Sequence, residues 1–113
     1  MELPIATWEE IMTWFGEEPE NHSKPDEILL AHYDIYCYSG EAHVIYRVGD
    51  KYFYVSGSHC SCYGLEDQWD PEEYTIDLLI GALDRMSSEF DSYRALLIDK
   101  LKERLTNEAE VRL

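Results

Sequence analysis

The sequence predicts an α+β domain, in which a three-stranded antiparallel β-meander has a short N-terminal helix and two C-terminal helices packed on it. Three observations lead to this prediction. Apolar residues recur at helical spacing near the N-terminus, alternate with a period of two between residues 28 and 56, and return to helical spacing beyond residue 70. A chain of 113 residues can bury one sizeable core, so we expect residues 1–113 to form a single domain.

The first helix is predicted in the stretch TWEEIMTWFGEE. Thr7 can cap its first turn, with Glu10 as the capping-box partner three residues later, and Gly16 ends the run. Prolines and polar residues then predict a surface connection up to residue 27. The apolar side of the helix is expected to consist of Trp8, Ile11, Met12 and Phe15.

Three strands are expected in residues 28–56, with one turn that includes Gly40 and a second at Gly49-Asp50. Strict alternation along the first strand places Leu29 and Leu30 on opposite faces. With two-residue loops, the predicted core face carries Tyr33, Ile35, Cys37, Ala42, Val44, Tyr46, Phe53 and Val55. The other face then carries Tyr36, Tyr38, His43, Ile45, Arg47, Tyr52 and Tyr54. A three-residue loop would invert this assignment.

Residues 57–69 are predicted to form a junction loop, after which a helix begins at Asp70. Asp70 suits the N-cap position, Pro71 the first helical position and Glu73 the third. Trp69 lies just before this cap and is expected to pack as a hydrophobic staple.

Two C-terminal helices are expected within residues 70–107, and residues 108–113 are expected to form a frayed tail. The buried stripe of the first helix is predicted to be Leu78, Leu79, Ala82, Leu83 and Met86. The buried stripe of the second is predicted to be Phe90, Tyr93, Leu97, Leu101 and Leu105.

Charge is the strongest compositional signal, because 24 acidic residues stand against 9 basic ones, for a formal net charge of −15. Such an excess repels nucleic acid and anionic membranes and favours a basic protein partner. The start, MELPIATWEE, lacks the pattern of a signal peptide, and no window approaches the roughly 18 apolar residues of a membrane span. We therefore expect a cytoplasmic protein without direct nucleic-acid or membrane binding, and no cofactor is predicted.

The acidic residues gather in two stretches, a first acidic stretch at residues 9–27 and a second acidic stretch at residues 66–77. Both could imitate nucleic-acid phosphates to a basic groove, or could be solvated surfaces. The residues predicted to bind a basic partner are Glu66, Asp67, Asp70, Glu72 and Glu73.

Two alternative sites compete with the acidic one. His59, Cys60 and Cys62 have side chains suited to zinc or thiol chemistry, but their spacing supplies only half of a usual zinc site. Nearby carboxylates would raise the pKa of a thiol, so the pattern favours a structural loop and a binding protein over an enzyme. The other alternative is a tyrosine-rich sheet face that could serve as an interaction module or a homodimer contact, unless a helix covers it. This face carries Tyr36, Tyr38, His43, Tyr52 and Tyr54.

The stretch SGEAHVIYRVGDKYFYVSGSHCSCYGLEDQWDPEEYT resembles a family of small bacteriophage and prophage proteins. The family is similar in a Tyr-rich strand, a G-S-H-C-S-C-x-G-L-E-x-Q-W-x-P-E-E block and a following helix, and the resemblance covers residues 39–83. It implies a phage setting and carries over no catalytic residue. Small acidic phage proteins are often inhibitors of host machinery, including anti-CRISPR and DNA-mimic proteins. We therefore predict a phage-encoded inhibitor that occludes a basic, nucleic-acid-binding surface of a host protein.

Overall fold

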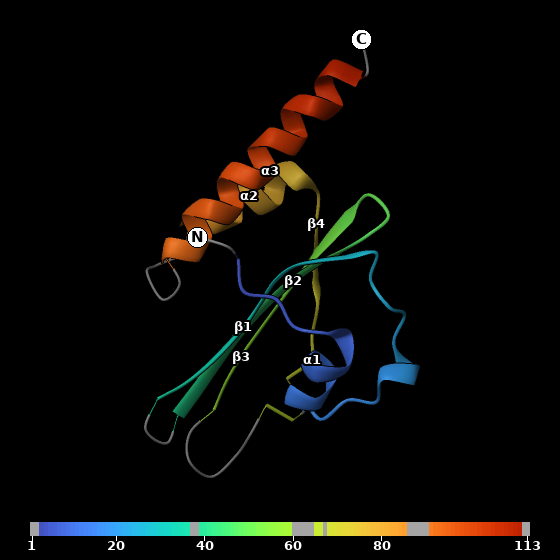
Figure 1. Cartoon of the computed structure of the whole chain (residues 1–113), viewed down its shortest axis with the longest axis vertical. Coiled ribbons are helices and arrows are strands. Elements are labelled where there is room, and N and C mark those ends of the chain that lie inside the picture. The colour runs from blue at the N-terminus through green and yellow to red at the C-terminus, as the bar shows by residue number, and fades with distance from the viewer. Residues whose placement is uncertain (1–2, 37–38, 60–64, 67, 86–90, 112–113) are drawn as a thin grey trace.

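The computed structural model describes residues 3–36, 39–59, 65–66, 68–85 and 91–111 (Figure 1). It confirms an α+β fold with three helices and an antiparallel sheet, but the sheet has four strands instead of the predicted three. In chain order the elements are α1 (Trp8–Trp14), the 3-10 turn η1 (Pro19–Asn21), β1 (Glu27–Tyr36), β2 (Ser39–Val48), β3 (Lys51–His59), β4 (Glu72–Tyr74), α2 (Ile76–Arg85) and α3 (Asp91–Val111).

The sheet has the order β1-β2-β3-β4, and each strand is antiparallel to its neighbour. Tyr33 pairs with Ala42, and Val44 pairs with Val55, so these side chains share one face as predicted. Tyr36 pairs with Ser39 and Ile35 pairs with Gly40, so Ser39 and Gly40 belong to β2 and not to the predicted turn. Cys37, Tyr38 and the side chains of Ile35 and Tyr36 lie outside the described part of the chain.

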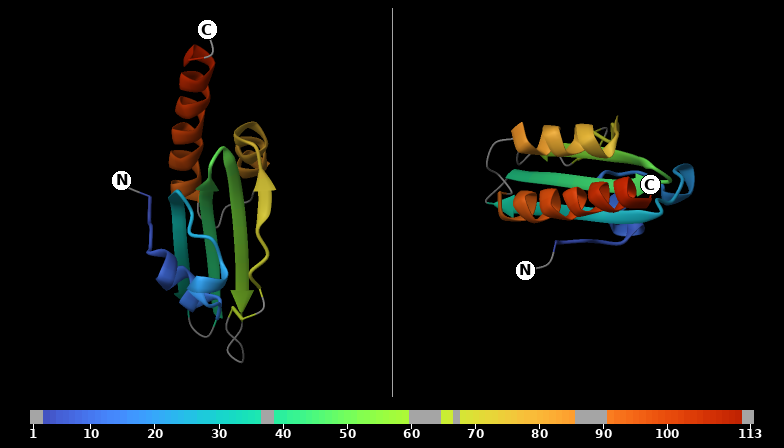
Figure 2. Two further views of the ribbon diagram at one scale, coloured as in Figure 1. Left: turned by 90° about the vertical axis from the view of Figure 1, so that its right-hand side faces the viewer. Right: turned by 90° about the horizontal axis from the view of Figure 1, so that it is seen from above.

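Both faces of the sheet are buried, whereas the length of the chain had suggested a single core (Figure 1). One face packs in an α1 cluster of buried Trp8, Ile11, Met12, Phe15, Ala31, Ala42, Val44, Tyr46, Val55 and Leu65. The other packs in an α2/α3 cluster of buried Leu29, Leu30, Ile45, Tyr52, Tyr54, Ile76, Leu79, Leu83, Leu97 and Leu101. Figure 2 shows the strands side by side, with α3 extending past the end of the sheet.

A β-bulge overturns the strict alternation predicted for the first strand. The register of β1 against β2 shifts between Ile28 and Leu30, which leaves Leu29 as the extra residue. Leu29 and Leu30 consequently both join the α2/α3 cluster. A period of two does not reveal such an insertion, because the bulge is defined by the partner strand.

The predicted helix start at Asp70 is wrong. Residues 72–74 form β4, in which Glu73 pairs with Phe53 of β3, and α2 begins only at Ile76. Thr75 caps this helix, since its Oγ1 accepts the N–H of Leu78 at 3.4 Å. Pairing with the otherwise open edge of β3 gives the backbone of residues 72–74 partners that a local capping pattern cannot anticipate.

The buried stripe of α2 differs from the predicted one at its beginning. Leu78 was predicted to be buried but is 62% exposed, and Ile76 takes its place in the α2/α3 cluster. Leu79, Ala82 and Leu83 are buried as predicted, while Met86 lies outside the described residues.

The two other helices follow their predicted patterns more closely. Thr7 Oγ1 accepts the N–H of Glu10 at 3.1 Å, and Gly16 adopts a φ of +66° two residues after α1. Leu97 and Leu101 of α3 are buried. The predicted frayed tail is wrong in part, since α3 continues to Val111.

An ion pair ties α3 to the beginning of β1. Arg104 donates through Nη1 to Glu27 Oε1 at 2.6 Å and through Nη2 to the second carboxylate oxygen, while Arg47 Nε donates to Oε1 at 3.2 Å. The hydrogen bond from Arg104 is the largest effect that lowers the pKa of Glu27, from 4.5 to about 2. The carboxylate is therefore charged throughout the physiological range.

Candidate functional site

An aromatic groove of about 380 Å³ lies on the α1 side of the sheet. This size falls within the roughly 300–1,000 Å³ of typical ligand pockets. Its aromatic lining consists of Trp8, Tyr46, Phe53 and Trp69. The remaining lining consists of His22, Ser23, Val48 and Pro71. The groove is therefore assembled from α1, the connection before β1, the strands β2 and β3, and the segment that leads into β4.

Tyr46 lies at the centre of the aromatic lining. Its ring stacks on Phe53 with centroids 5.2 Å apart and on Trp69 with centroids 5.9 Å apart, and Trp8 meets it edge-on at 5.3 Å. Each ring limits the rotation of its neighbours, so the surface they form is held in place before any ligand arrives. Burial raises the pKa of the Tyr46 hydroxyl to about 12, so this group stays uncharged at neutral pH.

The two acidic stretches meet at this groove. The first stretch contributes His22 to the lining and the second contributes Trp69, and the two rings lie 6.0 Å apart. A second contact joins the same stretches, because a Cβ added at Gly16 would lie 2.9 Å from Glu66 Cγ. These two contacts thus bring part of each acidic stretch together on the α1 side of the sheet.

Four of the five acidic residues predicted to bind a partner are exposed, and Asp67 lies outside the described residues. Asp70 stands between the groove residues Trp69 and Pro71. Glu73 pairs with Phe53 across the β3–β4 ladder and therefore shares its face of the sheet, where the groove lies. The Glu73 carboxylate lies 3.7 Å from the ammonium of Lys51, and the Glu73 side chain is more than half exposed.

The remaining two predicted acidic residues have other surroundings. Glu72 pairs with Tyr54 on the opposite face of the sheet and accepts a hydrogen bond from Tyr74 Oη at 2.7 Å. Glu66 packs against Gly16 and, by its charge, adds to burial in raising the pKa of Tyr33. Asp70 and Glu73 are therefore the predicted carboxylates next to residues of the groove, although neither lines it, and Glu66 joins the two acidic stretches.

The alternative tyrosine-rich face does not form an open surface. His43, Tyr52 and Tyr54 are 7%, 4% and 7% exposed, and the two tyrosines pack beneath α2 and α3. His43 Nδ1 and Tyr54 Oη are hydrogen-bonded at 2.6 Å, which satisfies polar atoms inside this layer. The prediction of a free tyrosine surface is wrong for these three residues because amphipathic helices cover that face. Tyr38 and the side chain of Tyr36 lie outside the described part.

The predicted alternative metal or thiol site is only partly within the described chain, since Cys60 and Cys62 lie outside it. His59 ends β3, and its Nε2 is hydrogen-bonded to Tyr33 Oη at 2.6 Å. The ring lies so close to Gly40 that a Cβ there would be 2.3 Å from Nε2. Within the residues that the structure describes, no group of three His, Cys, Asp or Glu side chains could hold a metal ion.

Trp69 is the residue of the groove that sequence reasoning misplaced. It was expected to staple a helix at Asp70, but its ring contacts Trp8 at 5.5 Å and Phe15 at 5.2 Å in addition to Tyr46. The sequence did indicate the other side of the groove, because the predicted strand register placed Tyr46 and Phe53 on one face, and the two residues are paired in the structure.

The chain matches no family model, no curated protein and no solved structure. The resemblance to bacteriophage proteins therefore stays a prediction. Within the described ranges, no helix has both the length and the apolar character needed to cross a membrane.

Proposed function

We propose that this protein is a binding protein whose aromatic groove receives basic side chains of a partner protein. The observation that supports this most directly is the meeting of the two acidic stretches at the groove, through His22 and Trp69. A guanidinium or ammonium group over a Trp or Tyr ring gains about 0.5–2 kcal/mol, and more when water is excluded. Carboxylates at the same site add an attraction of the same sign.

Arginine fits this combination better than lysine. Its planar guanidinium can stack on an aromatic ring such as Trp69 while its N–H groups bind a carboxylate such as Asp70 or Glu73. The net charge of −15 adds a long-range attraction that speeds the encounter with a basic surface. In this proposal the groove orients the bound arginine side chain and gives specificity, whereas the negative charge of the whole protein increases the rate of association with the partner.

A basic surface rich in arginine is typical of proteins that bind nucleic acid. Occupation of such a surface by this protein would exclude the nucleic acid. Together with the resemblance to phage proteins, this supports an inhibitor that acts in the host cytoplasm on a defence or nucleic-acid-processing protein, as an anti-CRISPR-like protein or a DNA mimic.

The first experiment measures the affinity of the purified protein for an arginine-rich peptide by fluorescence polarisation at several salt concentrations. We expect affinity that falls steeply with salt, and weaker binding of the matched lysine-rich peptide. The double variant Asp70→Asn/Glu73→Gln should bind about tenfold more weakly. The control Asp99→Asn/Glu103→Gln makes the same change of charge on α3 and should bind almost as well as the native chain.

Equal losses in the two double variants would show that the groove has no special role. Capture from host lysate would then name the partner, and nucleic acid should compete with the protein for it. A captured partner that still binds nucleic acid at full strength would contradict inhibition by occlusion.

A further inference from the structure

The outer edge of β4 is an open strand edge beside the aromatic groove. Figure 2 shows β4, in yellow, at the edge of the sheet opposite β1. Among the described residues, no strand pairs with its outer side, and Glu72 and Glu73 are exposed there. An open edge presents backbone N–H and C=O groups that an extended segment of another chain can bind.

The hydrogen-bond pattern of the sheet determines which backbone groups of β4 point outward. The N–H of Ser58 donates to Gln68 Oε1 at 2.9 Å, so the backbone groups of Ser58 in β3 point away from β2. Direction alternates along a strand, so Tyr54 also points away from β2, toward its partner Glu72 in β4. The N–H and C=O of Glu73, the next residue, therefore point away from β3, into the open edge.

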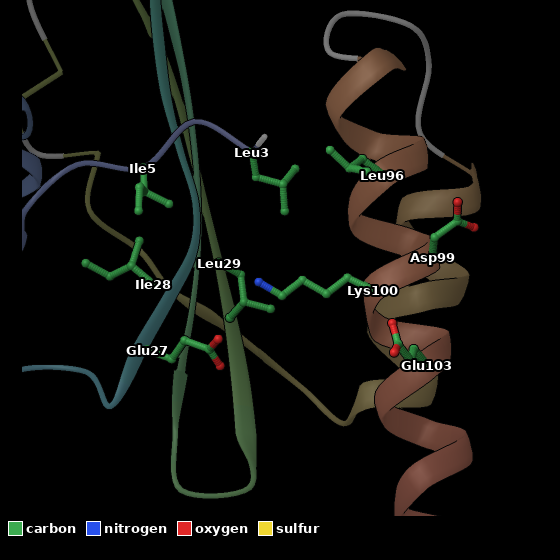
Figure 3. Close-up of a pocket in the computed structure, with 9 residues that line it drawn as sticks. All are labelled: Leu3, Ile5, Glu27, Ile28, Leu29, Leu96, Asp99, Lys100 and Glu103. Atoms are coloured by element: carbon green, nitrogen blue, oxygen red, sulfur yellow. The ribbon is translucent and has the colours of Figure 1, made fainter. Parts of the chain in front are cut away.

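The opposite edge of the sheet is already occupied in part. The N-terminal segment lies along β1, and Pro4 O accepts the N–H of Ala31 at 2.8 Å. Figure 3 shows Leu3 and Ile5 of this segment beside β1, where they line one groove with residues of β1 and α3. Within the described ranges, the chain thus provides a backbone partner for the outer edge of β1 but none for that of β4.

The charge around β4 favours a basic partner. Residues 70–77 contain four carboxylates and no lysine or arginine. Lys51 of β3 lies 3.7 Å from the Glu73 carboxylate, but both side chains are more than half exposed, and an ion pair of this kind is weak enough for an arginine to replace the lysine. A second copy of this chain fits less well, because antiparallel pairing of two β4 edges at Glu73 would place like charges opposite each other.

We propose that the basic partner contributes an extended segment that pairs with β4 as a fifth, antiparallel strand, with an arginine opposite Glu73. This inference rests on the proposed function and adds the conformation in which the partner presents its arginine. The arginine N–H donates to the C=O of Glu73, and the N–H of Glu73 donates to the arginine C=O.

This pairing directs the arginine side chain to the aromatic groove. Directly paired residues share a face, so the side chain lies on the face that carries Glu73 and Phe53, where the groove lies. Pro71, two residues before Glu73, lines the groove. The guanidinium can therefore bind the Glu73 carboxylate and extend over this segment toward the aromatic rings.

The test is NMR titration of the full chain with a threonine-rich peptide that contains one central arginine. We expect the amide proton of Glu73 to exchange with solvent more slowly once the peptide is bound, because its N–H then has a hydrogen-bond partner. Protection of this amide in the free protein at high protein concentration would show that a second copy occupies the edge, and would overturn the proposal.

N-methylation of the peptide backbone locates the pairing. A methyl group on the arginine nitrogen removes the donor to Glu73 and should weaken binding about tenfold, whereas on either neighbouring residue, whose N–H faces solvent, it should change affinity less than about twofold. Equal effects at these positions, or unchanged exchange at Glu73 in the complex, would overturn the edge pairing and leave the groove proposal standing. No binding of the unmodified peptide would overturn both.

A substitution in β4 tests the same hydrogen bond from the side of the protein. Glu73→Pro removes the outward N–H, and proline is tolerated on edge strands where the N–H faces solvent. Glu73→Ala is the matched control, because it removes the carboxylate but keeps the N–H. The proline variant should bind the peptide about fivefold more weakly than the alanine variant, and both should keep the circular dichroism of the native chain. Equal affinities of the two folded variants would contradict a backbone hydrogen bond at Glu73.

Discussion

The rings of His22 and Trp69 lie 6.0 Å apart, although β1, β2 and β3 all separate these residues along the chain. His22 belongs to the first acidic stretch and Trp69 to the second. Their contact therefore brings one residue of each stretch into the lining of the same aromatic groove. An aromatic surface with the exposed carboxylates of Asp70 and Glu73 nearby suits a basic side chain.

Trp69→Ala should weaken binding of the arginine-rich peptide about tenfold, because it removes a stacking surface of the groove. It should also lower the free energy of unfolding by about 2–4 kcal/mol, since the ring packs against Trp8, Phe15 and Tyr46. Peptide titration and urea unfolding measure the two effects.

Trp14→Ala is the matched control for this variant. Trp14 contacts the ring of Tyr33 at 5.4 Å and packs against the α1 cluster, but it does not line the groove. It should reduce stability without changing peptide affinity. If Trp14→Ala weakens peptide binding as much as Trp69→Ala, the loss comes from general destabilisation and the assignment of the groove fails.

Glu27 should make stability depend on acid pH. Its pKa is lowered from 4.5 to about 2 in the folded protein, so its stabilising effect is complete above about pH 4.5 and is lost as the pH falls toward 2. Glu27→Gln should therefore cost about 1–3 kcal/mol at pH 7 and much less near pH 2. Urea unfolding of both proteins across this range checks the prediction, and a difference that does not shrink with acid would contradict it.

Thr75→Ala should destabilise α2 by about 1 kcal/mol, because Thr75 caps that helix through its hydroxyl oxygen. Asp70→Ala, at the position where local pattern had predicted the cap, should leave the helix unaffected. Thermal unfolding followed by circular dichroism compares the two variants. A larger loss from Asp70→Ala would show that the helix begins earlier than Ile76.

Gly16→Ala should cost more stability than Gly49→Ala. Both glycines have positive φ, +66° and +62°, so each substitution carries about 1 kcal/mol of backbone strain. A Cβ at Gly49 meets no atom within 4 Å, whereas at Gly16 it would meet Glu66. The difference in unfolding free energy thus reports the contact between the two acidic stretches, and equal costs would mean that Glu66 moves aside freely.

Features that rest on nearby residues were predictable. The cap at Thr7 and the burial of Ile11 and Phe15 follow from spacing within a few turns of helix. The division of β2 and β3 into two faces also follows, because direct partners such as Val44 and Val55 must share a face once the turn is known.

Features that depend on a partner elsewhere in the chain were not predictable. The motif at Asp70, Pro71 and Glu73 fits a helix start, yet the residues that follow Pro71 pair with the edge of β3 and form β4. The bulge at Leu29 and the cover over Tyr54 likewise depend on which strand or helix lies opposite.

Composition and local periodicity are sufficient to predict the α+β class, the first helix, the meander and the large negative charge. The burial of both faces of the sheet and the meeting of the two acidic stretches became visible only in the folded chain. Folding also brought Trp8, Tyr46 and Trp69 together in one groove. These features depend on strand pairing and on burial of apolar surface between segments far apart in the chain. Residue spacing within one segment does not show which other segment will pack against it.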